Sequence, residues 1–116
     1  MGRRMSLVAK QHRFAMLVAR LLLKAQEMGM TVTLGDAYRD PRVHGPVGVA
    51  RAYGHARSCH KVRLAIDLNL FAPDGTYLEG ADAHRALGEW WEAQGGTWGG
   101  RFKDPNHYSL AHEGMK

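Results

Sequence analysis

Cysteine is almost absent from this sequence: Cys59 is the only one, so no disulfide can form within the chain. A small scaffold held together by disulfides is therefore excluded. No stretch approaches the ~18 consecutive apolar residues that a membrane-spanning helix needs. The 116 residues are also too few for two independent hydrophobic cores. We therefore expect one domain over residues 1–116.

Acidic residues are outnumbered by basic ones, 11 against 16, which gives a formal net charge of +5. Such an excess favours polyanionic surroundings, namely nucleic acid, anionic lipid or an anionic cell envelope. The basic residues are dispersed and form no tract of five or more, so a surface that merely confers solubility explains them as well. No small-residue cleavage site follows the basic N-terminus, which indicates a protein that stays in the cytoplasm after synthesis.

Hydrophobic periodicity predicts two helices. The first covers residues 6–28, where apolar side chains recur every three or four residues between an N-cap at Ser6 and a stop at Gly29. The second covers residues 82–93, with Asp82 as its N-cap. Between the helices, short β-favouring segments alternate with turn residues. We expect strands over 31–34, 62–71 and 76–78, the second and third forming a hairpin, and a last strand within 98–110 that is entered from a loop.

Asp67 lies inside an otherwise apolar strand. Alternation places Ala65, Asp67 and Asn69 on one face of that strand and the leucines on the other. A buried carboxylate needs a partner because an unpaired buried charge is costly. His60 is a candidate partner, and either a salt bridge or an edge-strand aspartate facing water explains Asp67 equally well.

Asp104 and His107 form a second candidate pair near the C-terminus. Residues three apart can face one cavity, one as a metal ligand and the other as a proton carrier. A turn capped by Asp104 accounts for the same spacing.

The segment from Ser58 through His60 to Asp67 resembles the Ser-x-His-x(6)-Asp signature of zinc peptidases that act on bacterial cell-wall peptides. Asp104, His107 and the following Tyr108 resemble the second signature of that family. The family includes D-Ala-D-Ala carboxypeptidases and phage endolysins of the L-alanyl-D-glutamate endopeptidase type. The resemblance covers about residues 30–110.

The phage endolysin branch is the most similar part of the family. Its members have sequences similar to Tyr38-Arg39, to the Ala-Ile-Asp-Leu-Asn-Leu-Phe stretch at 65–71 and to Trp-Gly-Gly-x-Phe at 98–102. The resemblance implies a small α+β domain in which helices pack on an antiparallel sheet with a zinc cleft, the fold shared by Hedgehog domains and DD-peptidases.

The same resemblance implies roles for individual residues. His60, Asp67 and His107 are expected to bind one Zn²⁺, and three protein ligands leave a position for water, as catalytic zinc requires. Asp104 is expected to carry the water's proton. Arg39 is expected to stabilise the oxyanion or hold a substrate carboxylate, with Arg42 as a competitor. Ser58 is expected to order the ligand loop or contact substrate, and Tyr108 to contact substrate. Arg63 replaces a glycine that is common in the signature.

The remaining candidates have simpler interpretations. His12 and His84 fall on predicted helices, where solvated faces are expected, and His112 falls in a tail. His44 and His55 lie in the irregular segment 35–57 and are weaker candidates for substrate contact. Cys59 is expected to be an inert packing residue. Three tryptophans are candidates for a sugar-stacking surface, although core packing is the simpler explanation for the first two: Trp90, Trp91 and Trp98.

We therefore expect a monomeric phage or prophage endolysin that cleaves peptidoglycan stem peptides, most readily at the L-Ala–D-Glu bond. It would be held in the host cytoplasm, would not insert stably in a membrane, and would reach the wall through a holin or another membrane lesion. A D-Ala-D-Ala carboxypeptidase and a zinc-stabilised binding module without turnover are the alternatives. Nucleic-acid binding is a more distant one, since no recognition motif supports it.

Overall fold

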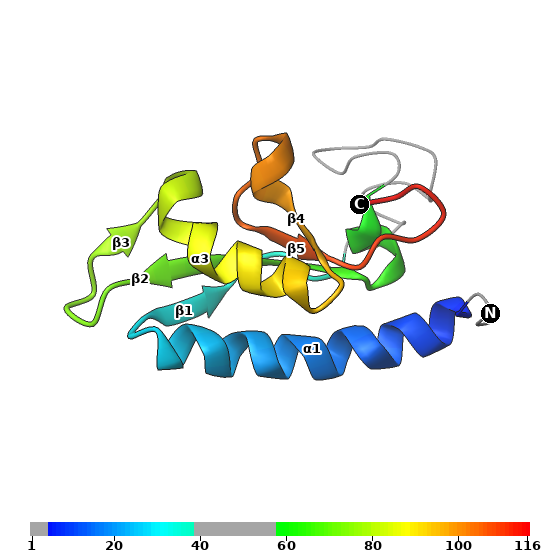
Figure 1. Ribbon diagram of the computed structural model, residues 1–116, viewed down its shortest axis with the longest axis horizontal. Helices are drawn as coiled ribbons and strands as arrows, with labels where there is room; N and C mark the ends of the chain where they lie inside the picture. Colours follow the sequence, from blue (N-terminus) through cyan, green and yellow to red (C-terminus); the bar gives the residue numbers. More distant parts are fainter. Residues whose placement is uncertain (1–4, 39–57) are drawn as a thin grey trace.

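The computed structural model describes residues 5–38 and 58–116 and shows the expected α+β domain (Figure 1). A long helix, α1, runs along one side of the molecule, and a shorter helix, α3, lies beside the strands (Figure 1). The helices and strands in chain order are α1 (Leu7–Glu27), β1 (Thr31–Leu34), β2 (Ala65–Phe71), β3 (Tyr77–Leu78), α3 (Gly80–Ala93), β4 (Thr97–Trp98) and β5 (His107–Ser109). Two 3₁₀ helices, η1 (Cys59–Val62) and η2 (Gly99–Phe102), precede β2 and β5.

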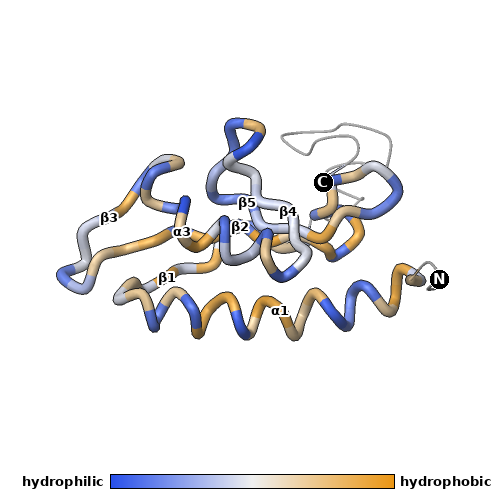
Figure 2. The backbone as a smooth tube through the Cα atoms, viewed as in Figure 1, coloured by the Kyte–Doolittle hydropathy of each residue, from blue (hydrophilic) through white to orange (hydrophobic). Residues whose placement is uncertain are grey.

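Helix α1 confirms the predicted first helix. The Ser6 hydroxyl caps it by accepting a hydrogen bond from the Ala9 backbone N–H at 3.1 Å. Gly29, with φ +83°, allows the chain to leave the last turn. The apolar and polar positions alternate along the helix with its own period (Figure 2). Its buried residues are spaced three and four apart, as an amphipathic helix requires: Phe14, Leu17, Leu21 and Ala25.

Helix α3 begins two residues earlier than predicted, and the expected cap at Asp82 is wrong. Its N-cap is Glu79, whose side chain makes no capping hydrogen bond. Gly80 has φ +90°, a conformation that glycine adopts without strain and that lets the chain turn into the helix sooner. Asp82 lies in the first turn, where its negative charge is favourable to the helix dipole.

Within residues 5–38 and 58–116, five strands form one antiparallel sheet in the order β1-β2-β5-β4, with β3 paired to β2. The predicted hairpin is confirmed, since Leu70 pairs with Leu78. The last strand predicted within 98–110, entered from a loop, is β5, and the segment before it forms β4, η2 and a turn. Gly99 and Gly100 favour the compact turn, and Lys103 adopts a left-handed conformation with φ +64° that a strand does not tolerate.

The core joins both helices to the sheet. Phe14 of α1 meets Trp91 of α3 edge to face at 6.0 Å, and Trp91 meets Tyr108 of β5 at 6.1 Å. The Trp91 indole also donates a hydrogen bond to the Ser109 carbonyl at 2.9 Å. Because side chains alternate along a strand, the neighbours of these core residues in β2 and β5 point to the other face. None of the described helices is both long and apolar enough to span a membrane.

Candidate metal centre

Two adjacent strands place Asp67 and His107 directly opposite each other. Asp67 of β2 pairs with His107 of β5 in the antiparallel register. Directly opposed residues have Cβ atoms about 5 Å apart and their side chains on the same face of the sheet. Ile66 and Tyr108, the next pair, point to the core instead. The ladder by itself therefore brings a carboxylate and an imidazole together from residues 40 positions apart in the chain.

His60 reaches the same place from η1. The Ser58 hydroxyl accepts a hydrogen bond from the His60 backbone N–H at 3.2 Å, and Arg63 ends this turn in a left-handed conformation with φ +59°. The Ser58 side chain is buried, and this bond is compatible with the expected ordering of the ligand loop, whereas its contact with substrate stays a prediction.

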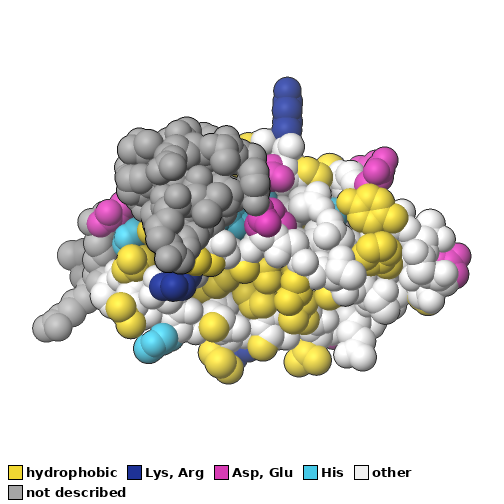
Figure 3. Space-filling model, turned by 180° about the vertical axis from the view of Figure 1, so that it is seen from behind, with side chains coloured by type: hydrophobic (Ala, Val, Ile, Leu, Met, Phe, Trp, Pro, Cys, Tyr) yellow, Lys and Arg dark blue, Asp and Glu magenta, His cyan; other side chains and the backbone are white. Residues whose placement is uncertain are grey.

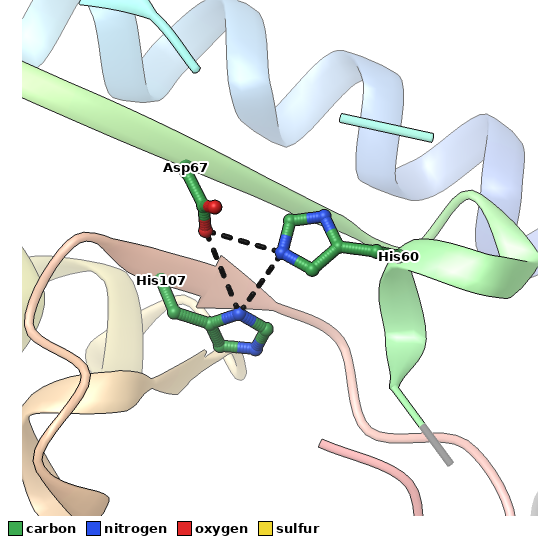
Figure 4. Close-up of side chains that lie close together, drawn as sticks. All are labelled: His60, Asp67 and His107. Carbon is green, nitrogen blue, oxygen red and sulfur yellow. Dashed lines mark hydrogen bonds and ion pairs between the residues drawn. The ribbon is translucent and has the colours of Figure 1, made fainter. Parts of the chain in front are cut away.

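The three side chains converge on one point (Figure 4). His60 Nε2 lies 3.1 Å from Asp67 Oδ1 and 3.3 Å from His107 Nδ1, and the third distance, His107 Nδ1 to Asp67 Oδ1, is 3.8 Å. A tetrahedral zinc with ligands at about 2.0–2.2 Å has ligand atoms about 3.4 Å apart. The observed triangle matches that spacing, so these residues form a possible metal site.

The hydrogen bond on the far side of the His60 ring identifies which nitrogen faces the site. His60 Nδ1 lies 2.9 Å from the Ala37 carbonyl oxygen, which can only accept, so Nδ1 carries the proton. In the neutral ring, Nε2 then directs a lone pair at the Asp67 carboxylate. Two lone pairs at 3.1 Å repel unless a cation lies between them. A single proton can bridge only two of the three donor atoms, whereas a metal ion can be coordinated by all three.

Asp67 is ionised in this arrangement. Burial by itself raises the pKa of Asp67, whereas hydrogen bonds and charge from His107 and His60, which these rings supply only when they carry an extra proton, lower that pKa below its usual range. A cation held between the three side chains would take the place of those protons and would keep the carboxylate charged in the same way. A charged carboxylate and neutral imidazoles are the forms that bind a divalent metal.

Asp104 lies beside the cluster. Its Oδ2 is 3.8 Å from His107 Nδ1, and the side chain is 55% exposed. Two hydrogen bonds hold the turn that carries Asp104. The Asp104 N–H donates to the Gly99 carbonyl, and the Trp98 indole donates to the Pro105 carbonyl. An exposed carboxylate next to a buried ligand cluster has the access to water that a proton carrier needs.

Gly99 is a residue of this site that sequence reasoning missed. A Cβ atom at Gly99 would collide with the Asp104 carbonyl oxygen and with the His107 Cβ. Only glycine lets η2 pack this closely against the turn that holds the proton carrier and a ligand. The Gly-Gly pair was visible in the sequence, but nothing local to it indicated which backbone it would touch.

Tyr108, expected to contact substrate, lies in the core. Its side chain is 0% exposed, with its hydroxyl 2.7 Å from His84 Nδ1, and its contact with substrate stays a prediction. The prediction of a solvated helix face for His84 is wrong, because His84 is also 0% exposed. Burial lowers the pKa of His84 to about 4 and raises that of the Tyr108 hydroxyl, so both groups are neutral.

Several other predicted residues can now be placed. Cys59 is fully buried, its thiol donates to the Leu110 carbonyl at 3.3 Å, and burial raises its pKa to about 11, which fits an inert packing residue. Trp91 and Trp98 are buried and offer no sugar-stacking surface. His12 is exposed, as expected, and His112 Nδ1 lies 3.0 Å from Lys10 Nζ. Four predicted residues lie outside the described residues: Arg39, Arg42, His44 and His55.

Comparison with known families agrees with this geometry. A family model described as D-alanyl-D-alanine carboxypeptidase matches residues 52–110, just over half of the chain. The chain belongs to this family of zinc peptidases. The match includes His60, Asp67 and His107, so the possible metal site lies within the part of the chain that defines the family. A search of curated proteins found no match.

Proposed function

We propose that this carboxypeptidase-family protein is a phage or prophage endolysin that hydrolyses the L-Ala–D-Glu bond of peptidoglycan stem peptides. The observation that carries a hydrolytic function is the convergence of His60 Nε2, Asp67 Oδ1 and His107 Nδ1, with the Asp104 carboxylate 3.8 Å from one of them. The endolysin role rests on the resemblance of residues 65–71 and 98–102 to the phage branch of the family.

His60, Asp67 and His107 would hold the zinc. When bound, zinc lowers the pKa of a coordinated water to ~7 and polarises the scissile carbonyl. The chain's own contribution begins with the Ala37 carbonyl, which keeps the proton on the outer nitrogen of His60. The paired strands hold the backbone positions of the other two donors opposite each other.

Asp104 performs the proton transfer. Its carboxylate accepts a proton from the attacking water as the new C–O bond forms at the carbonyl carbon. It then delivers that proton to the leaving amine nitrogen as the C–N bond breaks, and it ends the cycle ionised again. The products are a free carboxylate and a free amine. Arg39 is the proposed oxyanion or carboxylate partner.

The matched family's own description favours a second candidate, D-alanyl-D-alanine carboxypeptidase activity. Both reactions use the same ligands and proton carrier, so the metal site does not distinguish them. The difference lies in which stem-peptide bond enters the site.

Product analysis distinguishes the candidates. Purified Gram-negative peptidoglycan is digested with the zinc-loaded protein, and the soluble products are identified by mass spectrometry. We expect peptides with a new D-Glu amino terminus and no released D-Ala. Release of D-Ala alone would assign the carboxypeptidase reaction. Zinc binding at one ion per chain without any product would assign a binding module.

The lytic role is tested separately. Added protein should reduce the turbidity of Gram-negative cells whose outer membrane has been permeabilised, and a chelator should prevent this. Intact cells producing the protein alone should remain turbid until a membrane lesion is introduced. Lysis that persists after metal removal would refute the proposed chemistry.

A further inference from the structure

Helix α1 carries a second row of apolar side chains, on the side opposite the core. Val8 is 58% exposed, Met16 63% and Leu23 65%. Together with the exposed Ala15 and Ala19 they recur at helical spacing, and we call these five residues the outer strip. From Val8 to Leu23 the strip is about 22 Å long at 1.5 Å per residue. In Figure 3, hydrophobic side chains gather along the lower part of the molecule, where α1 runs.

Three basic residues of α1, Arg13, Arg20 and Lys24, lie along one flank of the outer strip, between it and the buried face. Lys10 lies at the edge of the buried face, where its Nζ is 3.0 Å from His112 Nδ1. At 100° per residue, the following four fall within one quadrant of the helix: Lys10, Arg13, Arg20 and Lys24. The single acidic residue of the helix, Glu27, already pairs with Lys24 at 3.2 Å. The flank is therefore strongly positive, whereas the side chains of the strip beside it are apolar, with the exposed His12 as the one polar side chain among them.

A hollow of about 330 Å³ lies at the junction of strip and flank. It is lined by Arg13, Met16, Leu17, Arg20 and Gln94. The Arg13 guanidinium is held in place by donating to the Gln94 carbonyl at 3.1 Å, and the exposed Arg20 lies two turns further along the same flank. Two guanidinium groups beside an apolar side chain suit a phosphate group that carries an apolar tail.

We propose that the outer strip and its basic flank bind the surface of an anionic phospholipid bilayer. The apolar side chains enter the boundary between headgroups and acyl chains, and Arg13 and Arg20 contact lipid phosphates. The inner face of α1 stays on the core, so the whole domain lies on the membrane surface. This inference is independent of the proposed peptidase reaction.

Charge and polarity favour an anionic bilayer over a second copy of the chain or nucleic acid as the partner of the outer strip and its flank. A second copy of the chain would supply an apolar surface, but it would bring the same arginines and, on α1, only a glutamate that is already paired. Nucleic acid would satisfy the arginines but would leave the apolar strip exposed to water. An anionic bilayer satisfies both features at once.

The test is co-sedimentation of the full-length protein with vesicles. We expect binding to equimolar phosphatidylglycerol and phosphatidylcholine, little binding to phosphatidylcholine alone, and release at high ionic strength. The double variant M16Q/L23Q should bind at least about tenfold more weakly. Arg20→Gln should bind about fivefold more weakly, as expected for one cation near an anionic surface.

The matched control is Arg85→Gln, which removes an exposed arginine of α3 instead. It should bind anionic vesicles nearly as the unchanged protein does. All substituted side chains are exposed, and unchanged circular dichroism will verify that each variant folds. Equal binding to both vesicle types, unchanged binding of M16Q/L23Q, or equal losses in Arg85→Gln and Arg20→Gln would overturn the proposal. A dimer in sedimentation equilibrium that M16Q/L23Q dissociates, without vesicle binding, would assign the strip to a second copy instead.

Discussion

Two carboxylates near the same histidine have different environments and therefore different uses. Asp67 lies within the cluster, where its contacts with the His107 and His60 rings lower its pKa. Asp104 lies at the edge of the cluster and is more than half exposed. The first is suited to holding a cation and the second to exchanging a proton with water, and their exposure makes the difference.

Replacing the exposed carboxylate should separate metal binding from catalysis. Asp104→Asn keeps the size of the side chain but removes its ability to accept a proton, so we expect kcat to fall about 10²–10⁴-fold. Zinc content, measured by atomic emission on the purified variant, should stay at one ion per chain. Asp82→Asn, at a fully exposed carboxylate on α3, is the control and should have normal activity. A variant that loses its zinc would show that Asp104 is a ligand.

Short elements carry this site, and each is secured by contacts outside itself. Strand β5 has three residues, yet Trp91 bonds to its backbone and the His84 ring lies against its Tyr108 hydroxyl. Helix α3 therefore holds the strand that presents His107. His84 Nε2 is buried and has no hydrogen-bond partner within the described part of the chain, so protonating this ring inside the fold is costly.

Acid should weaken the contact between α3 and β5 through His84. The pKa of His84 is about 4 in the folded chain against 6.5 for the ordinary group, so the unfolded chain takes up the proton first as pH falls. The stabilisation is complete above pH 6.5 and is lost on the way to pH 4, which amounts to about 3 kcal/mol at about 1.4 kcal/mol per unit.

The variant His84→Gln has no such titration and retains an acceptor for the Tyr108 hydroxyl. Urea unfolding of both proteins in matched buffers should show the advantage of the unchanged chain shrinking between pH 6.5 and 4. Titrations of all other groups are common to both proteins and cancel in the difference. Parallel stability curves would contradict the assignment of this pH dependence to His84.

The whole molecule joins a helical core on one side of the sheet with the ligand cluster on the other. Three donors from η1, β2 and β5 meet only when those elements are packed. The unfolded chain has no such cluster, so binding of a metal favours the folded state and adds directly to the free energy of unfolding.

Zinc should therefore stabilise the protein against heat. At free zinc one hundred times the dissociation constant, we expect about 2.7 kcal/mol and a clear rise in Tm, reversed by a chelator. His107→Ala should show no rise, whereas His12→Ala, at an exposed position of α1, should show the full rise. Calorimetric scans with and without zinc provide the measurement. A full zinc-dependent rise in His107→Ala would place the metal elsewhere.

Local pattern was sufficient for the features that depend on neighbours in sequence. The period of apolar residues determined α1 almost to the residue, and the turn residues before Thr76 determined the hairpin of β2 and β3. Alternation placed Asp67 on the face opposite the leucines. The identity of the three donors also followed from the sequence, through their resemblance to a family signature.

Tertiary structure decided what depends on segments that are distant in the chain. His12 and His84 occupy similar helical contexts, but only His84 is buried, because β5 brings Tyr108 against it. Gly99 is required because the backbone of Asp104 returns to touch it. The proton on His60 is placed by the carbonyl of Ala37, 23 residues away. Burial, close approach and hydrogen bonding between distant segments arise only when the chain is folded. The spacing of residues along the sequence therefore does not predict them.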